Sequence, residues 1–157
     1  ESDRYNYRRE ELLAQIKVAL GGRAAEKVVF DDLSTGAESD IQNLTQVARG
    51  MVGRWGMSEA VGPIAVTDGR QDGVLLPGTV PASEPTQELV DAEVRRIVEE
   101  AEQEVVGLLT RERDRLEALA NALLERETLD QPDAYDVAGV ALPQADAAES
   151  ATAAVTP

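Results

Sequence analysis

The sequence predicts an all-α fold, a bundle of amphipathic helices, and three observations support this. Of the 157 residues, 43% are hydrophobic but only 3% are aromatic, so Leu, Val, Ile and Ala must build the core. That composition suits packed helices better than a sandwich or barrel, which needs more β-branched and aromatic runs. Apolar residues also recur three and four positions apart through several long segments, as on a buried helical face. The length is sufficient for a domain with a core of its own.

The first predicted helix begins near Arg8 and runs to Phe30, after a polar, irregular lead-in. Gly21 and Gly22 interrupt it: they either end the helix and let a new one start, or let a neighbouring helix come close. We favour one continuous helix in which the glycines and Ala24–Ala25 form a close-packing face, at a cost of about 1 kcal/mol per glycine. Its apolar stripe consists of Leu12, Leu13, Ile16, Leu20, Ala24, Val28 and Val29.

A second helix is predicted from Gly36 to Trp55, after a turn at Asp31–Asp32. Ser34 and Thr35 are typical helix caps rather than nucleophiles, because the sequence has no histidine and no nearby lysine to activate them. The apolar stripe of this helix consists of Ile41, Leu44, Val47 or Ala48, Met51, Val52 and Trp55.

Asp40 is the one residue of this helix that suggests chemistry. It precedes Leu44 by four residues and Ala48 by eight, so it lies along the edge of the apolar stripe. A carboxylate that points inward must be paired, hydrogen-bonded or bound to a metal. The alternative is that Asp40 stabilises the helix start electrostatically. A single carboxylate does not make a zinc site, so the other ligands of such a site would come from outside this chain.

The segment 62–83 is rich in Gly, Pro and Asp-Gly pairs, which predict turns rather than a helix. Ile64–Val66 and Val74–Leu76 are short apolar runs that could pair as a small β-ribbon. An irregular loop is the alternative, and the sequence leaves both interpretations open.

The longest predicted helix begins at Ser83, with Pro85 in its first turn. Its stripe gives way to a second one after a register shift at 110–114, which predicts a long C-terminal helical hairpin. The acids considered besides Asp40, namely Glu26, Asp91 and Glu93, are expected on helix surfaces. The two stripes consist of Leu89, Val90, Val94, Ile97, Ala101, Val105, Leu108 and Leu109, then Leu116, Leu119, Ala120, Leu123 and Leu124.

The end of the chain changes in character after the hairpin. Thr128–Asp130 is typical of a last helix cap, with one further turn after Pro132. From Leu142 onward the residues are small, without period and with few large apolar groups. We therefore expect one domain, 1–139, and a disordered tail, 140–157.

Charge and composition exclude several classes of function. A net charge of −15 repels phosphate backbones, so we expect no nucleic-acid partner. The sequence has no cysteine and no histidine, which excludes disulfides, a Ser-His-Asp triad and any thiolate or imidazole metal site made from this chain alone. No apolar run is long enough to span a bilayer, so we expect this chain itself to be soluble. It begins at Glu1 rather than Met, and we expect it to be part of something longer.

Several motifs occur in an order that resembles a known family. The sequence is similar, from about Asp3 to Leu129, to the peptidase domain of the FtsH family, the membrane-anchored AAA+ zinc metalloproteases. The motifs that carry the resemblance are Gly21–Glu26 (GGRAAE), Val29-Phe30, Ser34–Ala37 with Asp40 (STGAxxD), Ala48-Arg49, Met51-Val52, Trp55–Ser58 (WGMS) and Gly62-Pro63, followed by Asp91, Glu93 and Val94 and by the leucines of the hairpin.

The resemblance implies a zinc site in which Asp40 is the third ligand. Two His of a His-Glu-x-x-His helix would supply the other ligands, and the Glu of that helix would be the general base for peptide-bond hydrolysis. This chain would therefore supply a metal ligand but no catalytic residue. The implied parent is a homo-hexamer at the cell membrane, with this domain on the cytoplasmic side. Its ATPase module would bind ATP and feed in unfolded or membrane protein substrates.

The sequence departs from the family pattern because the His-Glu-x-x-His helix is absent. Our leading hypothesis is that the chain is the C-terminal portion of such a protease, inactive and unable to hold zinc alone. The alternative is a non-catalytic FtsH-like helical scaffold or interaction module, in which Asp40 has a structural role. Without the zinc helix, we expect an exposed apolar surface along Ile16, Leu20, Leu44 and Ala48.

Overall fold

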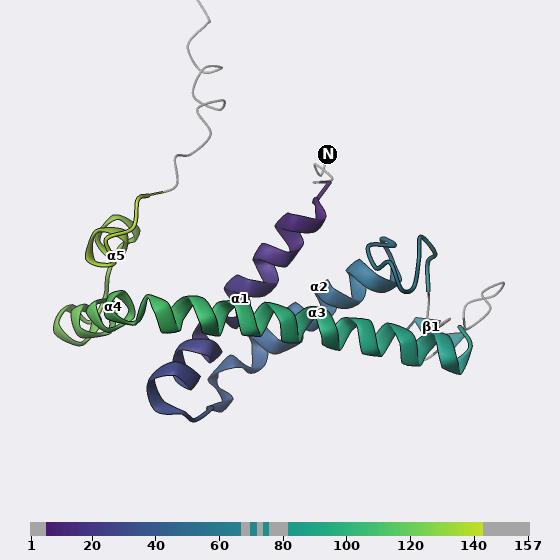
Figure 1. Cartoon of the computed structure of the whole chain (residues 1–157), viewed down its shortest axis with the longest axis horizontal. Helices are drawn as coiled ribbons and strands as arrows, with labels where there is room; N and C mark the ends of the chain where they lie inside the picture. Colours follow the sequence, from purple (N-terminus) through teal and green to yellow (C-terminus); the bar gives the residue numbers. More distant parts are fainter. Residues whose placement is uncertain (1–5, 67–69, 72–73, 76–81, 143–157) are drawn as a thin grey trace, which may run out of the picture. The chain divides into compact units, whose positions relative to one another are not determined.

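The computed structural model describes residues 6–66, 70–71, 74–75 and 82–142, and it confirms the predicted all-α class (Figure 1). The chain divides into two compact units, Glu1–Arg111 and Glu112–Pro157. The elements are α1 (Arg9–Phe30), the 3-10 helix η1 (Thr35–Ala37), α2 (Glu38–Gly53), β1 (Arg70–Gln71), β2 (Val74–Leu75), α3 (Glu84–Arg111), α4 (Arg113–Arg126) and α5 (Gln131–Val137).

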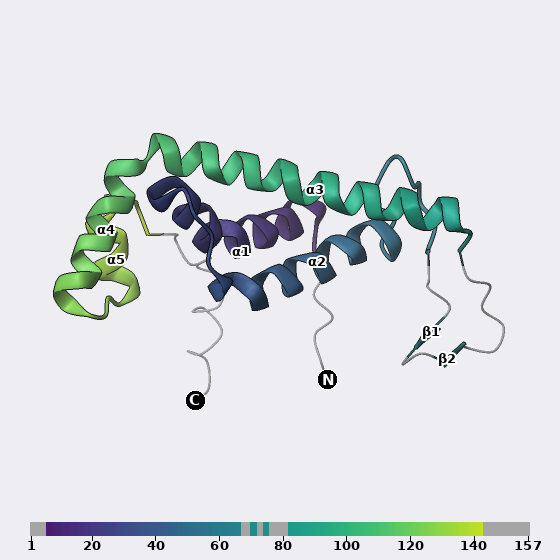
Figure 2. The same ribbon diagram turned by 90° about the horizontal axis from the view of Figure 1, so that it is seen from below.

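Three helices build the first unit. Each of α1, α2 and α3 packs against the other two, and α3 lies across both partners (Figures 1 and 2). The apolar stripes predicted from the sequence meet at this crossing. The core consists of Leu12, Ile16 and Leu20 from α1, Leu44, Ala48, Met51 and Val52 from α2, and Val90, Val94, Ile97 and Ala101 from α3.

The expected exposed apolar surface is a prediction that the structure overturns. Ile16, Leu20, Leu44 and Ala48 are all at most 2% exposed. They belong to the same core as the apolar stripe of α3, so this chain covers them itself. The error arose because periodicity shows which face of a helix is buried but not which neighbour covers it.

Helix α1 is continuous through Gly21 and Gly22, as we favoured, but the close-packing reason for these glycines is wrong. A Cβ built on either glycine would meet no heavy atom within 4 Å among the described residues outside the local helix backbone. Close packing begins one turn later, at the fully buried Ala24. The helix ends at Phe30 because Asp31 adopts the left-handed conformation, with φ of 52°, and its N–H donates to Lys27 O.

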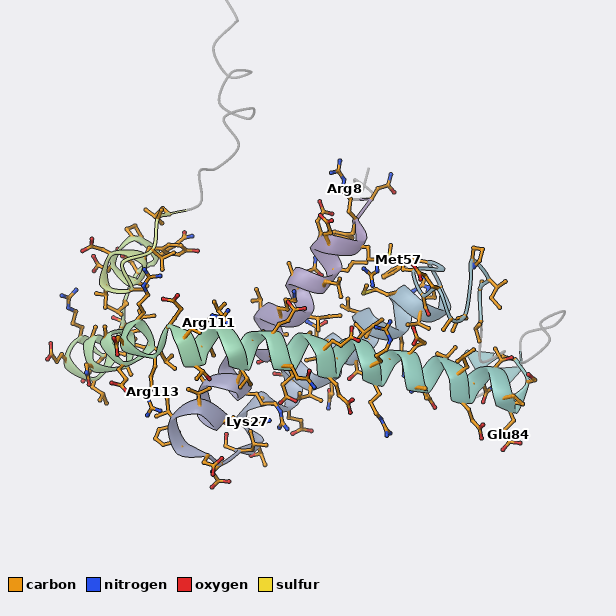
Figure 3. The ribbon with its side chains drawn as sticks, viewed as in Figure 1. Arg8, Lys27, Met57, Glu84, Arg111 and Arg113 are labelled. Carbon is orange, nitrogen blue, oxygen red and sulfur yellow. The ribbon has the colours of Figure 1, made fainter. Side chains whose placement is uncertain are left out.

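Ion pairs join α3 to the other two helices of this unit. Lys17 pairs with Glu104, Arg23 Nε lies 3.3 Å from Glu102 Oε1, and Arg49 Nη2 lies 2.7 Å from Asp91 Oδ1. Lys27, near the end of α1 in Figure 3, lies 4.0 Å from the same Glu102 oxygen. Most of these side chains are partly exposed, so each pair contributes about 1 kcal/mol or less and mainly fixes helix register.

A small β-ribbon is present in the segment 62–83. Its second strand falls within the predicted run 74–76, but its first strand is 70–71 and not the predicted 64–66. β1 and β2 pair antiparallel, with Gln71 opposite Val74 and Arg70 opposite Leu75. Ile64–Val66 is not a strand; the N–H of Val66 instead donates to Gly53 O at 2.7 Å, at the end of α2. The observed pairing closes a shorter loop than pairing 64–66 with 74–76, so it costs less chain entropy.

The second unit contains α4 and α5. Helix α4 begins at Arg113, inside the predicted register shift, and Asp130 Oδ1 accepts from Asp133 N at 2.9 Å, which confirms the last predicted cap. Among the described residues of the second unit, Ala122 and Ala138 are the buried apolar ones. The hairpin and the single domain 1–139 remain predictions, and the predicted tail beyond Leu142 lies outside the described residues.

Candidate functional site

Asp40 lies in the first turn of α2, one helical turn before the buried Leu44. Its side chain is exposed, although Leu44 and Ala48 on the same helical row are buried. Among the described residues no hydrogen bond or ion pair engages its carboxylate. On this row of α2 the core therefore ends at Leu44, and the carboxylate of Asp40 lies one turn beyond it. The expectation that it points into the core is not met within this chain.

The segment before Asp40 is fastened to α1 by a carboxylate. Glu26 Oε1 accepts from Ser34 Oγ at 2.6 Å, and Glu26 Oε2 accepts from Ser34 N at 3.0 Å. Ser34 Oγ also accepts from Gly36 N at 3.2 Å, which confirms Ser34 as a cap. The hydrogen bonds from the Ser34 hydroxyl and then its amide lower the pKa of the Glu26 carboxyl. Sequence reasoning placed Glu26 on the helix surface and missed this contact, because its partner is eight residues away.

The donor chemistry at Asp40 fits one ligand of a divalent metal. Carboxylate oxygens are common ligands of zinc, and an exposed, unpaired carboxylate can bind a metal without first breaking a protein contact. Within the described ranges, however, no group of three His, Cys, Asp or Glu side chains could hold a metal ion. Asp40 thus fits a shared site whose other ligands come from elsewhere, which is also what the absence of His and Cys from the sequence requires.

A second polar cluster consists of Ser58 and Glu93, which are buried between α3 and the segment after α2, and of Arg96, whose side chain is partly exposed. Glu93 Oε2 accepts from Ser58 Oγ at 2.7 Å, and Glu93 Oε1 accepts from Arg96 Nε at 2.9 Å. Arg96 and then Ser58 lower the pKa of the Glu93 carboxyl, and Glu93 raises that of the Arg96 guanidinium. The buried polar atoms of this cluster all have partners among the described residues, so we assign it a structural role.

The role of Glu93 was missed in the sequence although a signal for it existed. Glu93 was expected on the solvated face, yet it is only 9% exposed. It lies three residues after Val90 and four before Ile97, which is the spacing of the apolar stripe itself. An acid on that row can be buried and still be paired when an arginine follows three residues later, because residues at this spacing lie on neighbouring positions of the helix surface.

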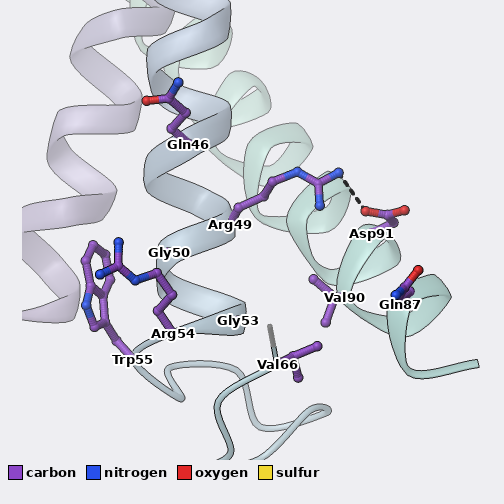
Figure 4. Close-up of a pocket in the computed structure, with 10 residues that line it drawn as sticks. All are labelled: Gln46, Arg49, Gly50, Gly53, Arg54, Trp55, Val66, Gln87, Val90 and Asp91. Atoms are coloured by element: carbon purple, nitrogen blue, oxygen red, sulfur yellow. Dashed lines mark hydrogen bonds and ion pairs between the residues drawn. The ribbon is translucent and has the colours of Figure 1, made fainter. Parts of the chain in front are cut away.

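Trp55 lines a hollow of about 520 Å³ at the other end of α2 (Figure 4). The indole was expected in the core but is 47% exposed, and its ring lies against Gly50, where a Cβ would come within 2.9 Å of it. Figure 4 shows Arg49 reaching toward Asp91 across the hollow. The hollow is distinct from the Asp40 region, because nine residues of helix at 1.5 Å each separate Asp40 from Arg49 by about 14 Å.

Comparison with known proteins places this sequence in a family. Residues 1–137 match the family described as Peptidase family M41. The chain is 59% identical over 140 residues to the ATP-dependent zinc metalloprotease FtsH 3 of Conexibacter woesei, covering 89% of this chain and 19% of that protein. It is 44% identical over 143 residues to the ATP-dependent zinc metalloprotease FtsH of Thermobaculum terrenum, covering 89% of this chain and 22% of the relative.

A third relative extends the match to nearly the whole sequence. The chain is 43% identical over 157 residues to the ATP-dependent zinc metalloprotease FtsH 4 of Sphaerobacter thermophilus. This match covers 98% of this chain and 24% of that protein. The chain therefore spans about a fifth to a quarter of the length of these relatives. None of the helices in the described part is both long and apolar enough to cross a bilayer.

Proposed function

The chain belongs to peptidase family M41, and from this membership we propose that it is the C-terminal part of the peptidase domain of an ATP-dependent zinc metalloendopeptidase. Its proposed task is to present Asp40 as the third zinc ligand and to supply the helical body that carries this residue. The observation that supports it is the position of Asp40: it is exposed and unpaired among the described residues, and it lies in the first turn of α2, four residues before the buried Leu44.

The residues of this chain account for how Asp40 would be presented. Leu44, Ala48, Met51 and Val52 fix α2 in the core, so its first turn projects from a rigid body. When bound, zinc would supply Lewis acidity and activate a water for peptide-bond hydrolysis. The two His ligands and the general-base Glu would come from the part of the parent protein outside this chain, so no catalytic residue is assigned here.

The proposal also covers the nucleotide, the oligomeric state and the substrates of the parent protein. We propose that ATP binds an ATPase module of the same parent and not this chain. The parent would be a membrane-anchored homo-hexamer with this domain on the cytoplasmic side, and unfolded or membrane proteins would be its substrates. The role of ATP is supported by the names of relatives of which the chain covers about a fifth. The membrane anchor, the hexamer and the substrates follow only from the resemblance to the FtsH family.

The decisive experiment replaces Asp40 in the protein encoded by the full reading frame. Asp40→Asn keeps the shape of the side chain but removes the negative charge that favours zinc, so we expect zinc content to fall from about one per subunit to well below that. ATP-dependent peptidase activity should fall with it, while helix content by circular dichroism stays unchanged. Zinc is measured by metal analysis after gel filtration.

Glu38→Gln is the matched control, because Glu38 lies in the same first turn and is also exposed. It should retain zinc and activity. If Asp40→Asn also retains both, the zinc-ligand role is wrong and the alternative gains support, namely a non-catalytic helical scaffold or interaction module. The isolated 157-residue chain provides a second check, since it should show no stoichiometric zinc binding by calorimetry.

A further inference from the structure

We propose that Glu26 is a positioning residue for Asp40, acting through the hydroxyl and amide of Ser34; this inference rests on the proposed role of Asp40 as a zinc ligand. The carboxylate of Asp40 has no hydrogen bond among the described residues, so the backbone that leads into α2 sets its position. That backbone is the segment 31–37, and Glu26 on α1 bonds to its middle.

The contact between Glu26 and Ser34 fixes both partners. Each carboxylate oxygen of Glu26 accepts one hydrogen bond from Ser34, at 2.6 Å from the hydroxyl and at 3.0 Å from the amide. Two bonds from one residue define the orientation of the carboxylate as well as its distance, and hydrogen bonds to a charged acceptor are stronger than neutral ones. Glu26 lies on α1, whose buried residues Leu20 and Ala24 hold the helix in the core. The segment is thereby tied to a rigid element.

A short series of bonds carries this constraint to Asp40. Ser34 Oγ donates to Glu26 and accepts from Gly36 N at 3.2 Å, which fixes the start of η1. The N–H of Glu38 donates to Thr35 O, so η1 continues directly into α2. Asp40 is only two residues further on, in the first turn.

The reversal of the chain after α1 brings Ser34 within reach of Glu26. Asp31 takes a left-handed conformation and its amide bonds to Lys27 O at 3.2 Å, so the chain turns back along the last turns of the helix. Asp32 Oδ1 accepts from Leu33 N at 2.8 Å and closes the turn locally. Without Glu26, these local bonds would remain, but nothing in them ties Ser34 to α1.

A metal ligand is sensitive to such support. Ligating side chains must be held to within about 0.5 Å, and loss of a residue that orients a ligand typically costs about 10- to 100-fold in metal affinity. The exposed carboxylate of Asp40 has several rotamers and a backbone at a helix end, where fraying is greatest. Removing Glu26 should therefore loosen the first turn of α2 and speed the loss of zinc, while the helical core remains intact.

The test compares Glu26 variants in the full-length, zinc-loaded protein. The rate of zinc transfer to a colorimetric chelator should rise about 10-fold or more in Glu26→Ala. Ser34→Ala, which removes the hydroxyl but keeps the amide, should show a smaller increase. Glu26→Gln should lie near the wild type, because its amide group can still accept from Ser34 N and donate to Ser34 Oγ. A merely structural effect of lost charge would not be rescued by this variant.

The control is Glu11→Ala. Glu11 Oε2 accepts from Arg8 N at 2.7 Å, so this variant also removes a carboxylate cap, but at the far end of α1. Its zinc release should match the wild type. Amide hydrogen exchange in the isolated chain gives a readout without metal. The exchange rates of residues 36–40 should rise in Glu26→Ala and stay at the wild-type values in Glu11→Ala.

The outcomes separate this inference from the proposed function. If Asp40→Asn loses zinc but Glu26→Ala releases it at the wild-type rate, Glu26 does not position Asp40 although the ligand assignment stands. If Glu11→Ala accelerates release as much as Glu26→Ala does, the effect is general destabilisation and the inference is overturned. If Asp40→Asn keeps its zinc, the ligand assignment fails and the inference fails with it, even where hydrogen exchange confirms that Glu26 orders the segment.

Discussion

At the scale of single residues, three carboxylates that look alike in the sequence occupy three different environments. Asp40 is exposed and unpaired among the described residues, and Glu26 is bonded twice to Ser34. Glu93 is buried and bonded to the buried Ser58 and the partly exposed Arg96. Hydrogen-bond donors stabilise the charged forms of Glu26 and Glu93 and so lower the pKa of both carboxyls. Environment rather than residue type thus separates a candidate ligand from two structural acids.

The buried Glu93 makes a prediction about stability and pH. Glu93→Gln keeps the volume but removes the charge that Arg96 and Ser58 bond, so the free energy of unfolding at pH 7 should fall by about 1.5–3 kcal/mol. The folded pKa of Glu93 lies below its ordinary 4.5, so its stabilising contribution is present above pH 4.5 and is lost as the pH falls below that value. The difference between wild type and variant should therefore shrink in acid, as measured by urea unfolding at several pH values.

Glu99→Gln serves as the comparison for that experiment. Glu99 is exposed on the same helix, so its variant should unfold within about 0.5 kcal/mol of the wild type at every pH. Equal losses in the Glu93 and Glu99 variants would mean that the net charge of α3, and not the buried cluster, sets the effect.

At the scale of elements, the two adjacent glycines of α1 lower the stability of the helix that contains them. Gly21 and Gly22 lie inside a continuous 22-residue helix, and a Cβ on either would meet open space among the described residues. Gly21→Ala and Gly22→Ala should each raise the free energy of unfolding of this chain by about 1 kcal/mol, because alanine costs less backbone entropy in a helix. Thermal and urea unfolding of the two variants would measure this.

Gly50→Ala in α2 is the opposing case. The same propensity gain applies, but the new Cβ would lie 2.9 Å from the Trp55 ring, so the indole must move. The variant should gain less than the α1 variants or lose stability, with a change in tryptophan fluorescence. Destabilisation by both α1 substitutions would show that another part of the protein packs against these glycines.

At the scale of the whole molecule, the main core belongs to one unit. Every residue of that core lies between Leu12 and Ala101, inside the first unit. A chain that ends at Arg111 should therefore keep a cooperative unfolding transition, since single cores of this kind unfold together. Urea titration followed by circular dichroism would test this against the 157-residue chain.

A chain that begins at Leu33 provides the contrast, because it lacks α1 and with it Leu12, Ile16 and Leu20 of the core. It should lose the cooperative transition. If the chain ending at Arg111 loses it as well, α4 and α5 contribute essential stability that their own few buried residues do not indicate.

The sequence by itself determined the helices and their buried faces. Periodicity located α1, α2 and α3 and most of the core residues, because a helix places every third or fourth residue on one face. The ordered motifs from GGRAAE to WGMS indicated the family, and with it the interest of Asp40.

Only the tertiary structure decided which neighbours those faces and charges meet. It showed that α3 covers Ile16, Leu20, Leu44 and Ala48, that Trp55 is exposed, and that Glu26 bonds to Ser34 and Glu93 to Ser58. These contacts join residues eight or more positions apart, across the turns that reverse the chain. A repeating pattern within one helix carries no information on them, because the partner is set by how separate helices pack.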